Sequence, residues 1–315
     1  MAVHSSGDLL VVYGRYAHRL DRHCVPQVQY RLPVDEPYNS FVLLDNGLLV
    51  TKNLSERTPA ALSVLDPHSL QPVCAPMPCP EPSVARLSAV GNTVYVVGVQ
   101  SIFRYHWRDD LHRLEPDAQW RHDYVRGTQQ SYGWDVVLNG VDAWFMDNGK
   151  HRYVYSMVGA GVSRTPNRLL RVNLQDASDH SAWEVCGAAG GSVTNPPVVD
   201  LSRNIVVAFD SANRQLRAWR ISPDRHTLTP LWHKKNFGAA SHMVLYQHTG
   251  ELVTNDYRRF GEEVVVLDIA SGVERGRVRT GGVMQGVVFP SPGWNRDVYW
   301  CSMGRLARVY VQAGP

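Results

Sequence analysis

A chain of 315 residues can fold as two ordinary domains or as one large all-β domain. Its 32 Lys and Arg residues nearly balance its 29 Asp and Glu residues, and the net charge of +3 gives no reason to expect a nucleic acid or a membrane as partner. Hydrophobic residues make up 44% of the chain without any long biased tract, which is typical of a globular protein with a sizeable core.

No segment of the sequence predicts secretion or membrane insertion. The first residues, MAVHSSGDLLVVYGR, lack the basic start and the long apolar stretch of a signal peptide. No apolar run approaches the roughly 18 residues that a membrane helix requires. The five cysteines are an odd number, and none has the spacing of a zinc site. We therefore expect reduced thiols and a cytoplasmic protein.

In chain order, the sequence consists of pairs of short apolar runs joined by tight polar turns. The first three pairs are SFVLLDNGLLVTKN (40–53), ARLSAVGNTVYVVG (85–98) and DVVLNGVDAWFMDN (135–148). The next three are PVVDLSRNIVVAFD (197–210), HMVLYQHTGELVTND (242–256) and QGVVFPSPGWNRDVYWCS (285–302). Turns such as Asn46-Gly47 favour hairpins, because Gly and Asn tolerate a positive φ. Each pair therefore predicts a β-hairpin.

A third and a fourth run follow most of these hairpins, as in AALSVLDPHSLQPVC (60–74) and EEVVVLDIASGVERGRV (262–278). Four antiparallel strands per repeat are typical of the blades of a β-propeller. The spacings between successive hairpins fit a blade of about 40–50 residues, except for the longer third one. The hairpins start at Asn39, Arg86, Trp134, Asn195, His242 and Gln285.

These six hairpins predict an all-β, six-bladed β-propeller of four-stranded antiparallel blades, in a single domain over residues 1–315. Residues 285–315 supply only three strands of the last blade. We expect DLLVVYG or VQYRLP, near the N-terminus, to supply the fourth strand and close the ring, which removes an exposed edge. The alternative is seven blades, with residues 8–33 as a blade of their own, although that segment is short for four strands.

The repeat EEVVVLDIASGVERGRVRTGG (262–282) resembles the strand–turn–strand repeat of quinoprotein-like propellers. In blade count the chain also resembles the gluconolactonase-like propellers. The resemblance covers nearly the full length, but it lies in the rhythm of the repeats and not in a catalytic motif. It therefore implies the fold much more than a function, and it does not imply a bound quinone.

Polar side chains recur at the starts of the predicted inner strands and at the ends of the second strands. In a propeller these two points open on the same face, beside the central channel, so we expect their side chains to converge on a polar pocket. His242, Asp135 and Arg86 are the expected catalytic residues, with His242 as general acid or base and Arg86 or Lys52 stabilising a developing anion. The residues expected to bind substrate are Asn39, Trp134, Asn195, Asp256, Tyr257, Arg258 and Gln285.

The same pocket could hold a divalent metal ion through Asp135, Asn195 and His242, because imidazole, carboxylate and amide oxygen are all metal ligands. The gluconolactonase-like resemblance implies such a metal at the channel mouth, held by acidic and amide ligands. This chain departs from that pattern, since no Glu stands at an inner-strand start and Arg86 adds a positive charge. The expected cofactor is therefore either none or a divalent metal ion.

Each of these residues also has a structural interpretation. Asp and Asn at strand ends often cap turns, and this role is favoured for Asp147, Asn148 and Asp210. Lys52 and Arg258 could be solvated charges at the rim, and a lone His such as His242 can be buried structure.

Two further segments have an expected structure. RYHWRDDLHRL (104–114) follows Phe103 and predicts a strand that places Phe103, Tyr105 and Trp107 on one face. DAQWRHDYVRGTQQSYG (117–133), which contains His122, could form a lid over the channel mouth.

The sequence therefore favours a soluble propeller enzyme of the hydrolase, lyase or isomerase type that acts on a small molecule. The alternative is a non-catalytic propeller that serves as a protein- or ligand-binding scaffold, with a protein partner on its Trp-, Tyr- and Arg-rich rim. A deep pocket with His242 and Asp135 would favour the enzyme, whereas a flat aromatic face would favour the scaffold.

Overall fold

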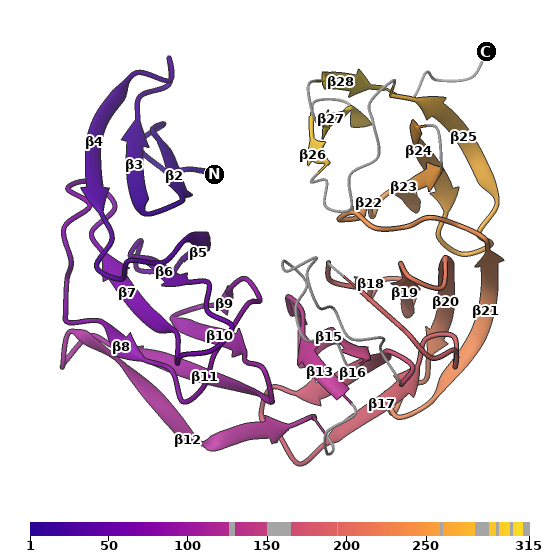
Figure 1. Ribbon diagram of the computed structural model, residues 1–315, viewed down its shortest axis with the longest axis horizontal. Helices are drawn as coiled ribbons and strands as arrows, with labels where there is room; N and C mark the ends of the chain where they lie inside the picture. The colour runs from indigo at the N-terminus through magenta and orange to yellow at the C-terminus, as the bar shows by residue number, and fades with distance from the viewer. Residues whose placement is uncertain are drawn as a thin grey trace. The chain divides into compact units, whose positions relative to one another are not determined.

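The computed structural model describes residues 1–125, 130–149, 165–193, 195–258, 261–280, 290–293, 296–302 and 305–310. Its regular elements are β-strands in seven antiparallel sheets (Figure 1). The chain packs as two compact units, which are Met1–Arg126 with Leu174–Ser178, and Gly127–Asn173 with Asp179–Pro315. That residues 1–315 form a single domain stays a prediction. No helix within the described residues is long and apolar enough to cross a membrane.

The first unit contains three sheets of four strands each. The first sheet is formed by β1 (Ala2–Val3), β2 (Leu9–Tyr13), β3 (Tyr16–Leu20) and β4 (Pro26–Arg31). The second is formed by β5 (Tyr38–Leu43), β6 (Leu49–Asn53), β7 (Ala61–Leu65) and β8 (Met77–Pro78). The third is formed by β9 (Ser88–Val90), β10 (Thr93–Val97), β11 (Ser101–Arg108) and β12 (Arg113–Asp123).

The second unit contains four sheets. In the first of them, β13 and β14 both pair with β15; its strands are β13 (Gln130–Gly133), β14 (Val137–Asn139), β15 (Asp142–Gly149), β16 (Arg168–Asn173) and β17 (His180–Glu184). The next is β18 (Val198–Asp200), β19 (Ile205–Asp210), β20 (Gln215–Ile221) and β21 (Leu228–Lys235). The third sheet is formed by β22 (Val244–Tyr246), β23 (Glu251–Arg258), β24 (Gly261–Asp268) and β25 (Glu274–Arg279). The fourth is formed by β26 (Ser291–Pro292), β27 (Val298–Ser302) and β28 (Arg305–Val309).

The fold is a seven-bladed β-propeller of antiparallel blades, so the prediction of six blades is wrong. The error lies at the N-terminus, where β1 to β4 pair with one another and do not complete the last sheet. The blade fits into so few residues because its first strand is only two residues long and Gly14, with a φ of 59°, makes the tight turn between β2 and β3. The alternative of an N-terminal seventh blade is confirmed, and it begins at Ala2.

Alternation along β11 agrees with the prediction from sequence. Phe103, Tyr105 and Trp107 are buried on one face, while Arg104 and His106 point to the other and are partly exposed. These aromatic side chains belong to a core cluster that also contains Leu62 and Val64 of the neighbouring sheet, among other residues. The aromatic residues therefore pack between blades, as expected for a strand with period-2 patterning.

The proposed lid around His122 is wrong for the residues that the structure describes. His122 lies on β12, opposite Ile102 of β11, so this part of the segment is an outer strand and not a loop. Residues 126–129 lie outside the described residues. The pairing of β11 with β12 is interrupted once, because residues 117–120 all lie opposite the single residue Arg104.

Asp117 ties this bulge to β11. Its Oδ2 accepts hydrogen bonds from Nε and Nη2 of Arg104, at 2.9 and 2.7 Å, and lies 3.2 Å from Nε2 of His106. Its Oδ1 accepts from the backbone N–H groups of Gln119 and Trp120. Burial alone would raise the pKa of Asp117, but the hydrogen bonds from Arg104 and His106 lower it to about 2.

This shift predicts an acid-dependent contribution of Asp117 to stability. A carboxyl whose pKa is lower in the folded state stabilises the protein above its unfolded pKa, and the stabilisation is lost as the pH falls toward the folded value. We expect urea unfolding to show wild type losing up to about 2 kcal/mol more than Asp117→Asn between pH 5 and pH 2. Parallel pH profiles for the two proteins would contradict the prediction.

An ion-pair network joins the first two sheets of the second unit. Arg171 of β16 is fully buried; its Nη1 donates to Oδ1 of Asp142 at 2.8 Å and its Nη2 donates to Asp179. Nε of Arg225, in the turn between β20 and β21, lies 2.9 Å from Oδ2 of Asp142, and Nε2 of His226 lies 3.4 Å from Oδ1 of Asp179. Two guanidinium groups thus balance two carboxylates at the junction of the two sheets.

Candidate functional site

Two of the predicted catalytic residues lie close together in the second unit. Nε2 of His242 is 3.8 Å from Oδ2 of Asp135. Asp135 lies two residues before β14 and His242 lies two residues before β22, so the pair comes from the inner-strand starts of two different sheets. The side chain of His242 is 27% exposed and that of Asp135 is 7% exposed. At 3.8 Å the two atoms are too far apart for a hydrogen bond, and the arrangement is that of a partly exposed imidazole beside a buried carboxylate whose charge can stabilise a positive charge on the ring.

The backbone just before His242 is held by two buried asparagines. Nδ2 of Asn195 donates to the carbonyl oxygen of Ala240 at 2.9 Å. Oδ1 of Asn255 accepts from the backbone N–H groups of Ala240 and Ser241, at 2.9 and 3.1 Å, and from Oγ of Ser241. These bonds fix the segment from which His242 projects. The structure therefore gives Asn195 a positioning contact; its expected contact with substrate stays a prediction.

Asn255 is itself oriented by a buried glutamate. Its Nδ2 donates to Oε1 of Glu262 at 2.9 Å, and Nε1 of Trp300 donates to Oε2 of the same carboxyl at 3.2 Å. Burial raises the pKa of Glu262, while the hydrogen bonds from Trp300 and Asn255 oppose that rise. Glu262 was not expected at the site, and Asn255 was expected only as one of the polar residues at the second-strand ends, without a catalytic or substrate-binding role. The position of Asn255 near the end of an apolar strand is a sequence signal for a role at the site. Glu262 has no such signal, because it stands at the beginning of an ordinary apolar strand.

Asn255→Ala is expected to lower the free energy of unfolding by about 2 kcal/mol, because it leaves buried N–H groups of Ala240 and Ser241 without their acceptor. Chemical denaturation measures the loss. Asn46→Ala is the control: Oδ1 of Asn46 accepts from the N–H of Leu48 at 3.1 Å in an exposed hairpin turn, so this change should cost less, about 0.5–1 kcal/mol. Equal effects of the two substitutions would show that Asn255 does not hold the His242 segment.

Three other residues that were expected to bind substrate make hydrogen bonds or ion pairs within the protein. Oδ1 of buried Asp256 accepts from the backbone N–H of Gly238 at 2.8 Å, and its Oδ2 is 2.9 Å from both Arg258 and Arg277. The hydroxyl of Tyr257 donates to the carbonyl oxygen of Ser211 at 2.8 Å. Arg258 is 57% exposed, in agreement with a solvated rim charge. Substrate contacts by these residues stay predictions.

Of the remaining predicted residues, two belong to the first unit and one lies outside the described residues. Asn39 belongs to the first unit, where its Nδ2 donates to the carbonyl oxygen of Val84 at 3.0 Å. This bond joins residues 45 positions apart, as does the bond from Asn195 to Ala240. The two asparagines therefore make equivalent side-chain-to-backbone bonds in different blades. Arg86 is half-buried in the first unit. Gln285 lies outside the described residues.

Trp134 is buried directly before Asp135, and its backbone N–H donates to the carbonyl oxygen of Met146 at 2.8 Å. It therefore anchors the segment that carries Asp135. A contact of its ring with substrate stays a prediction.

The second-strand ends cap backbone groups, as the structural interpretation expected. Each of three side chains accepts a backbone hydrogen bond through Oδ1: Asp147 from Arg168, Asn148 from Val193 and Asp210 from Ser192. Lys52 is fully buried, so the expectation of a solvated rim charge is wrong for this residue. Its Nζ donates to the carbonyl oxygen of Ser83 at 3.0 Å.

The arrangement of possible metal ligands around His242 gives the predicted metal site limited support. Among the described residues, no group of three or more His, Cys, Asp or Glu side chains is arranged to hold a metal ion. Asp135 and His242 could supply two ligands, but Nδ2 of Asn195 is directed at Ala240. The metal site stays a prediction. The five cysteines form no disulfide, in agreement with the expected free thiols.

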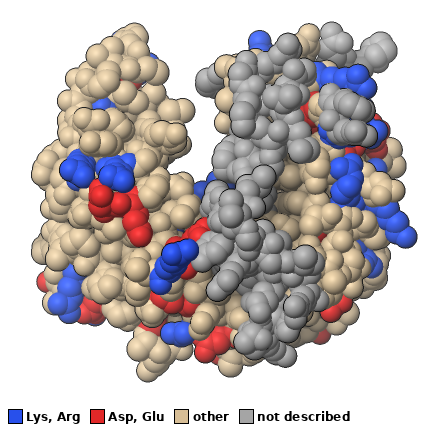
Figure 2. Space-filling model, viewed as in Figure 1, with Lys and Arg blue, Asp and Glu red and all other residues tan. Residues whose placement is uncertain are grey.

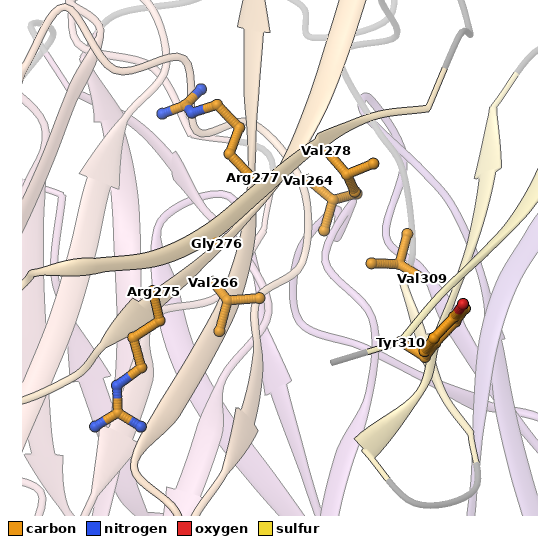
Figure 3. A pocket seen from close by; sticks show the side chains of 8 residues that line it. All are labelled: Val264, Val266, Arg275, Gly276, Arg277, Val278, Val309 and Tyr310. Atoms are coloured by element: carbon orange, nitrogen blue, oxygen red, sulfur yellow. The ribbon is translucent and has the colours of Figure 1, made fainter. Parts of the chain in front are cut away.

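The second unit contains a cavity of about 280 Å³ whose lining does not include the His242–Asp135 pair. Val264, Val266 and Val278 of β24 and β25 face Val309 and Tyr310 at the end of β28 (Figure 3). Arg275 and Arg277 extend away from the valines in that view. Neither His242 nor Asp135 lines the cavity. On the face seen in Figure 2, basic and acidic side chains of the described residues are interspersed, so no large patch of one sign marks a charged partner there.

Comparison with known proteins supports the fold alone. No family model and no curated protein matches the sequence. A "putative 6-phosphogluconolactonase" from Bacteroides uniformis has a similar structure, with a TM-score of 0.60, 13% identity and coverage of 96% of this chain and 95% of that one. The β-propeller domain of Cps50 (Swd1) from Myceliophteria thermophila has a TM-score of 0.61 and 11% identity, with coverage of 96% of this chain and 92% of that one. A protein from Lactobacillus plantarum has a TM-score of 0.64 and 12% identity, with coverage of 96% of this chain and 95% of that one. The chain therefore has a propeller fold that is shared by proteins of different functions.

Proposed function

We propose that this propeller is a small-molecule hydrolase in which His242 and Asp135 act as an acid–base pair on a cyclic ester. The observation that carries the proposal is the 3.8 Å approach of a partly exposed imidazole to a buried carboxylate. The similarity to the "putative 6-phosphogluconolactonase" from Bacteroides uniformis supports the choice of cyclic esters as the substrate class.

The state of two nucleophilic side chains of the second unit supports water as the attacking group. Oγ of buried Ser241 is engaged with Asn255 and with the carbonyl oxygen of His242. Sγ of Cys186 donates to Asp210, and burial raises its pKa to about 11, so at neutral pH it is a thiol and not a thiolate. A lactone is an ester that water can attack with general-base assistance alone.

In the proposed mechanism, His242 accepts a proton from water as the water oxygen forms a bond with the lactone carbonyl carbon. Asp135, whose Oδ2 lies 3.8 Å from Nε2 of the ring, balances the positive charge that develops on it. When the tetrahedral intermediate collapses, the ring C–O bond breaks and the leaving alkoxide takes the proton back from His242. The products are one hydroxy acid per lactone and an unchanged enzyme.

A pH-stat assay with a panel of sugar lactones, phosphorylated sugar lactones and simple alkyl lactones tests the proposal. We expect acid release above the buffer rate for at least one class, and we expect Asp135→Asn to reduce it at least about tenfold. Absence of turnover across the panel, or full activity in Asp135→Asn, would refute the proposal. Addition of a chelator, followed by Ca²⁺, Mg²⁺, Mn²⁺ or Zn²⁺, shows separately whether a metal contributes.

A protein-binding scaffold is the second candidate function. A propeller of a structure named Mitotic Checkpoint Complex is similar to this chain, with a TM-score of 0.65 and 9% identity. The turn between β2 and β3 also carries two exposed aromatic side chains, Tyr13 and Tyr16, which suit a protein-binding surface. If the protein is only a scaffold, wild type and His242→Ala will both stay at the buffer rate in every enzymatic assay.

A further inference from the structure

The first unit contains a cavity of about 450 Å³ between the end of β8 and the pair β11–β12. Its floor is formed by three buried side chains, Cys79, Phe103 and Tyr105. The rings of Phe103 and Tyr105 meet edge to face with their centroids 6.0 Å apart, and the Tyr105 hydroxyl donates to the carbonyl oxygen of Pro78 at 3.2 Å. The volume lies within the range of about 300–1,000 Å³ that small-molecule sites occupy.

The shape of the cavity depends on the bulge in β12. Residues 117–120 leave the strand opposite Arg104, and Pro116, Asp117 and Ala118 line the cavity at this point. The hydrogen bonds that Arg104 and the backbone N–H groups of the bulge donate to Asp117 fix this wall. The lining is therefore preformed, which lowers the cost of ligand binding.

The lining presents an uncharged floor and one available cationic donor. Burial raises the pKa of Cys79 to about 11, so its thiol is neutral at physiological pH. Arg104 is engaged by Asp117 and lies over the Trp120 ring, 4.9 Å from its centroid. Arg121 on the rim donates from Nε to Asp123 at 2.8 Å and also lies within electrostatic reach of Glu81. Within the described part of the chain, its two terminal nitrogens donate no hydrogen bond to the protein.

These features select the charge and shape of a ligand. The terminal nitrogens of Arg121 can hold a carboxylate through two parallel hydrogen bonds. The negative charge of Asp117 on the same lining disfavours a dianion such as a phosphate monoester. Phe103, Tyr105 and the surrounding prolines offer a flat apolar surface to the rest of the molecule.

We propose that this cavity binds a small monocarboxylate with a flat apolar body, of the arylacetate kind. The site lies in the first unit and shares no residue with the His242–Asp135 pair, so it is independent of the proposed hydrolase site. Its carboxylate contacts Arg121 and its ring covers Phe103 and Tyr105.

Phenylacetate and its neutral analogue phenylacetamide are the probes, measured by ligand-observed NMR titration of the full chain. We expect phenylacetate to bind with a Kd on the order of 1 mM, which suits so small a ligand. Arg121→Gln should weaken phenylacetate at least about fivefold and leave the weaker phenylacetamide unchanged. Ala118→Trp should fill the cavity and abolish binding of both probes.

Arg113→Gln, on the same strand but outside the cavity lining, is the matched control and should bind phenylacetate as wild type does. Circular dichroism verifies that each variant is folded. Absence of phenylacetate binding at about 10 mM, or equal binding by wild type, Arg121→Gln and Ala118→Trp, would overturn the proposal.

Discussion

Arg171→Met is expected to lower the free energy of unfolding by about 3–5 kcal/mol, because it leaves the carboxylates of Asp142 and Asp179 without their shared guanidinium. Asp142 is buried, and burial already raises its pKa against the opposing effect of Arg171 and Arg225. Urea unfolding at pH 7 measures the loss. Methionine has nearly the length of arginine, so the change tests the charge more than the volume.

Arg220→Met is the control for this experiment, because Arg220 lies exposed on β20 and, among the residues that the structure describes, its guanidinium makes only a 3.5 Å contact with the carbonyl oxygen of Arg203. It should change stability by about 0.5 kcal/mol or less. The double variant Arg171→Met/Asp142→Asn should recover part of the loss, since it removes one of the uncompensated charges. A loss below about 1 kcal/mol in Arg171→Met would contradict the role of the network.

His242→Ala is expected to lower kcat/KM for the lactone substrate at least about 100-fold, because the reaction loses its general base. Its stability should change by about 1 kcal/mol or less, since the side chain is partly exposed and contributes little to the apolar core. Steady-state kinetics and thermal denaturation measure the two effects. His248→Ala, in an exposed turn, is the matched control and should retain full activity.

Two other results for His242→Ala would count against the catalytic role. A large loss of stability with unchanged kcat/KM would identify the ring as structural. Unchanged stability with unchanged activity would place the reaction elsewhere in the protein.

The sequence predicts the blade architecture well because each blade depends on local patterns. Alternation in β11 and the Gly-containing turns identify hairpins without knowledge of distant contacts. The number of blades is harder to predict, since it depends on whether a two-residue strand such as Ala2–Val3 pairs within its own blade or elsewhere. A strand of that length has almost no sequence signal.

The candidate site was predicted only in part, for a related reason. The proximity of Asp135 and His242 could be predicted because inner-strand starts converge in a propeller, which is a property of the fold; their catalytic role stays a prediction. The same reasoning also selected Asn195 and Asp256, whose side chains bind the backbone of neighbouring segments. Sequence does not distinguish a polar group that faces a ligand from one that satisfies a buried backbone group, because both occur at strand ends.

A double-mutant cycle on Asp135 and His242 tests the central claim most directly. The kcat/KM values of wild type, Asp135→Asn, His242→Ala and the double variant are compared for the same lactone. If the two side chains act as one acid–base unit, the double variant will be no slower than His242→Ala alone, because the carboxylate has no function without the ring. Independent, multiplicative losses in the double variant would contradict the account.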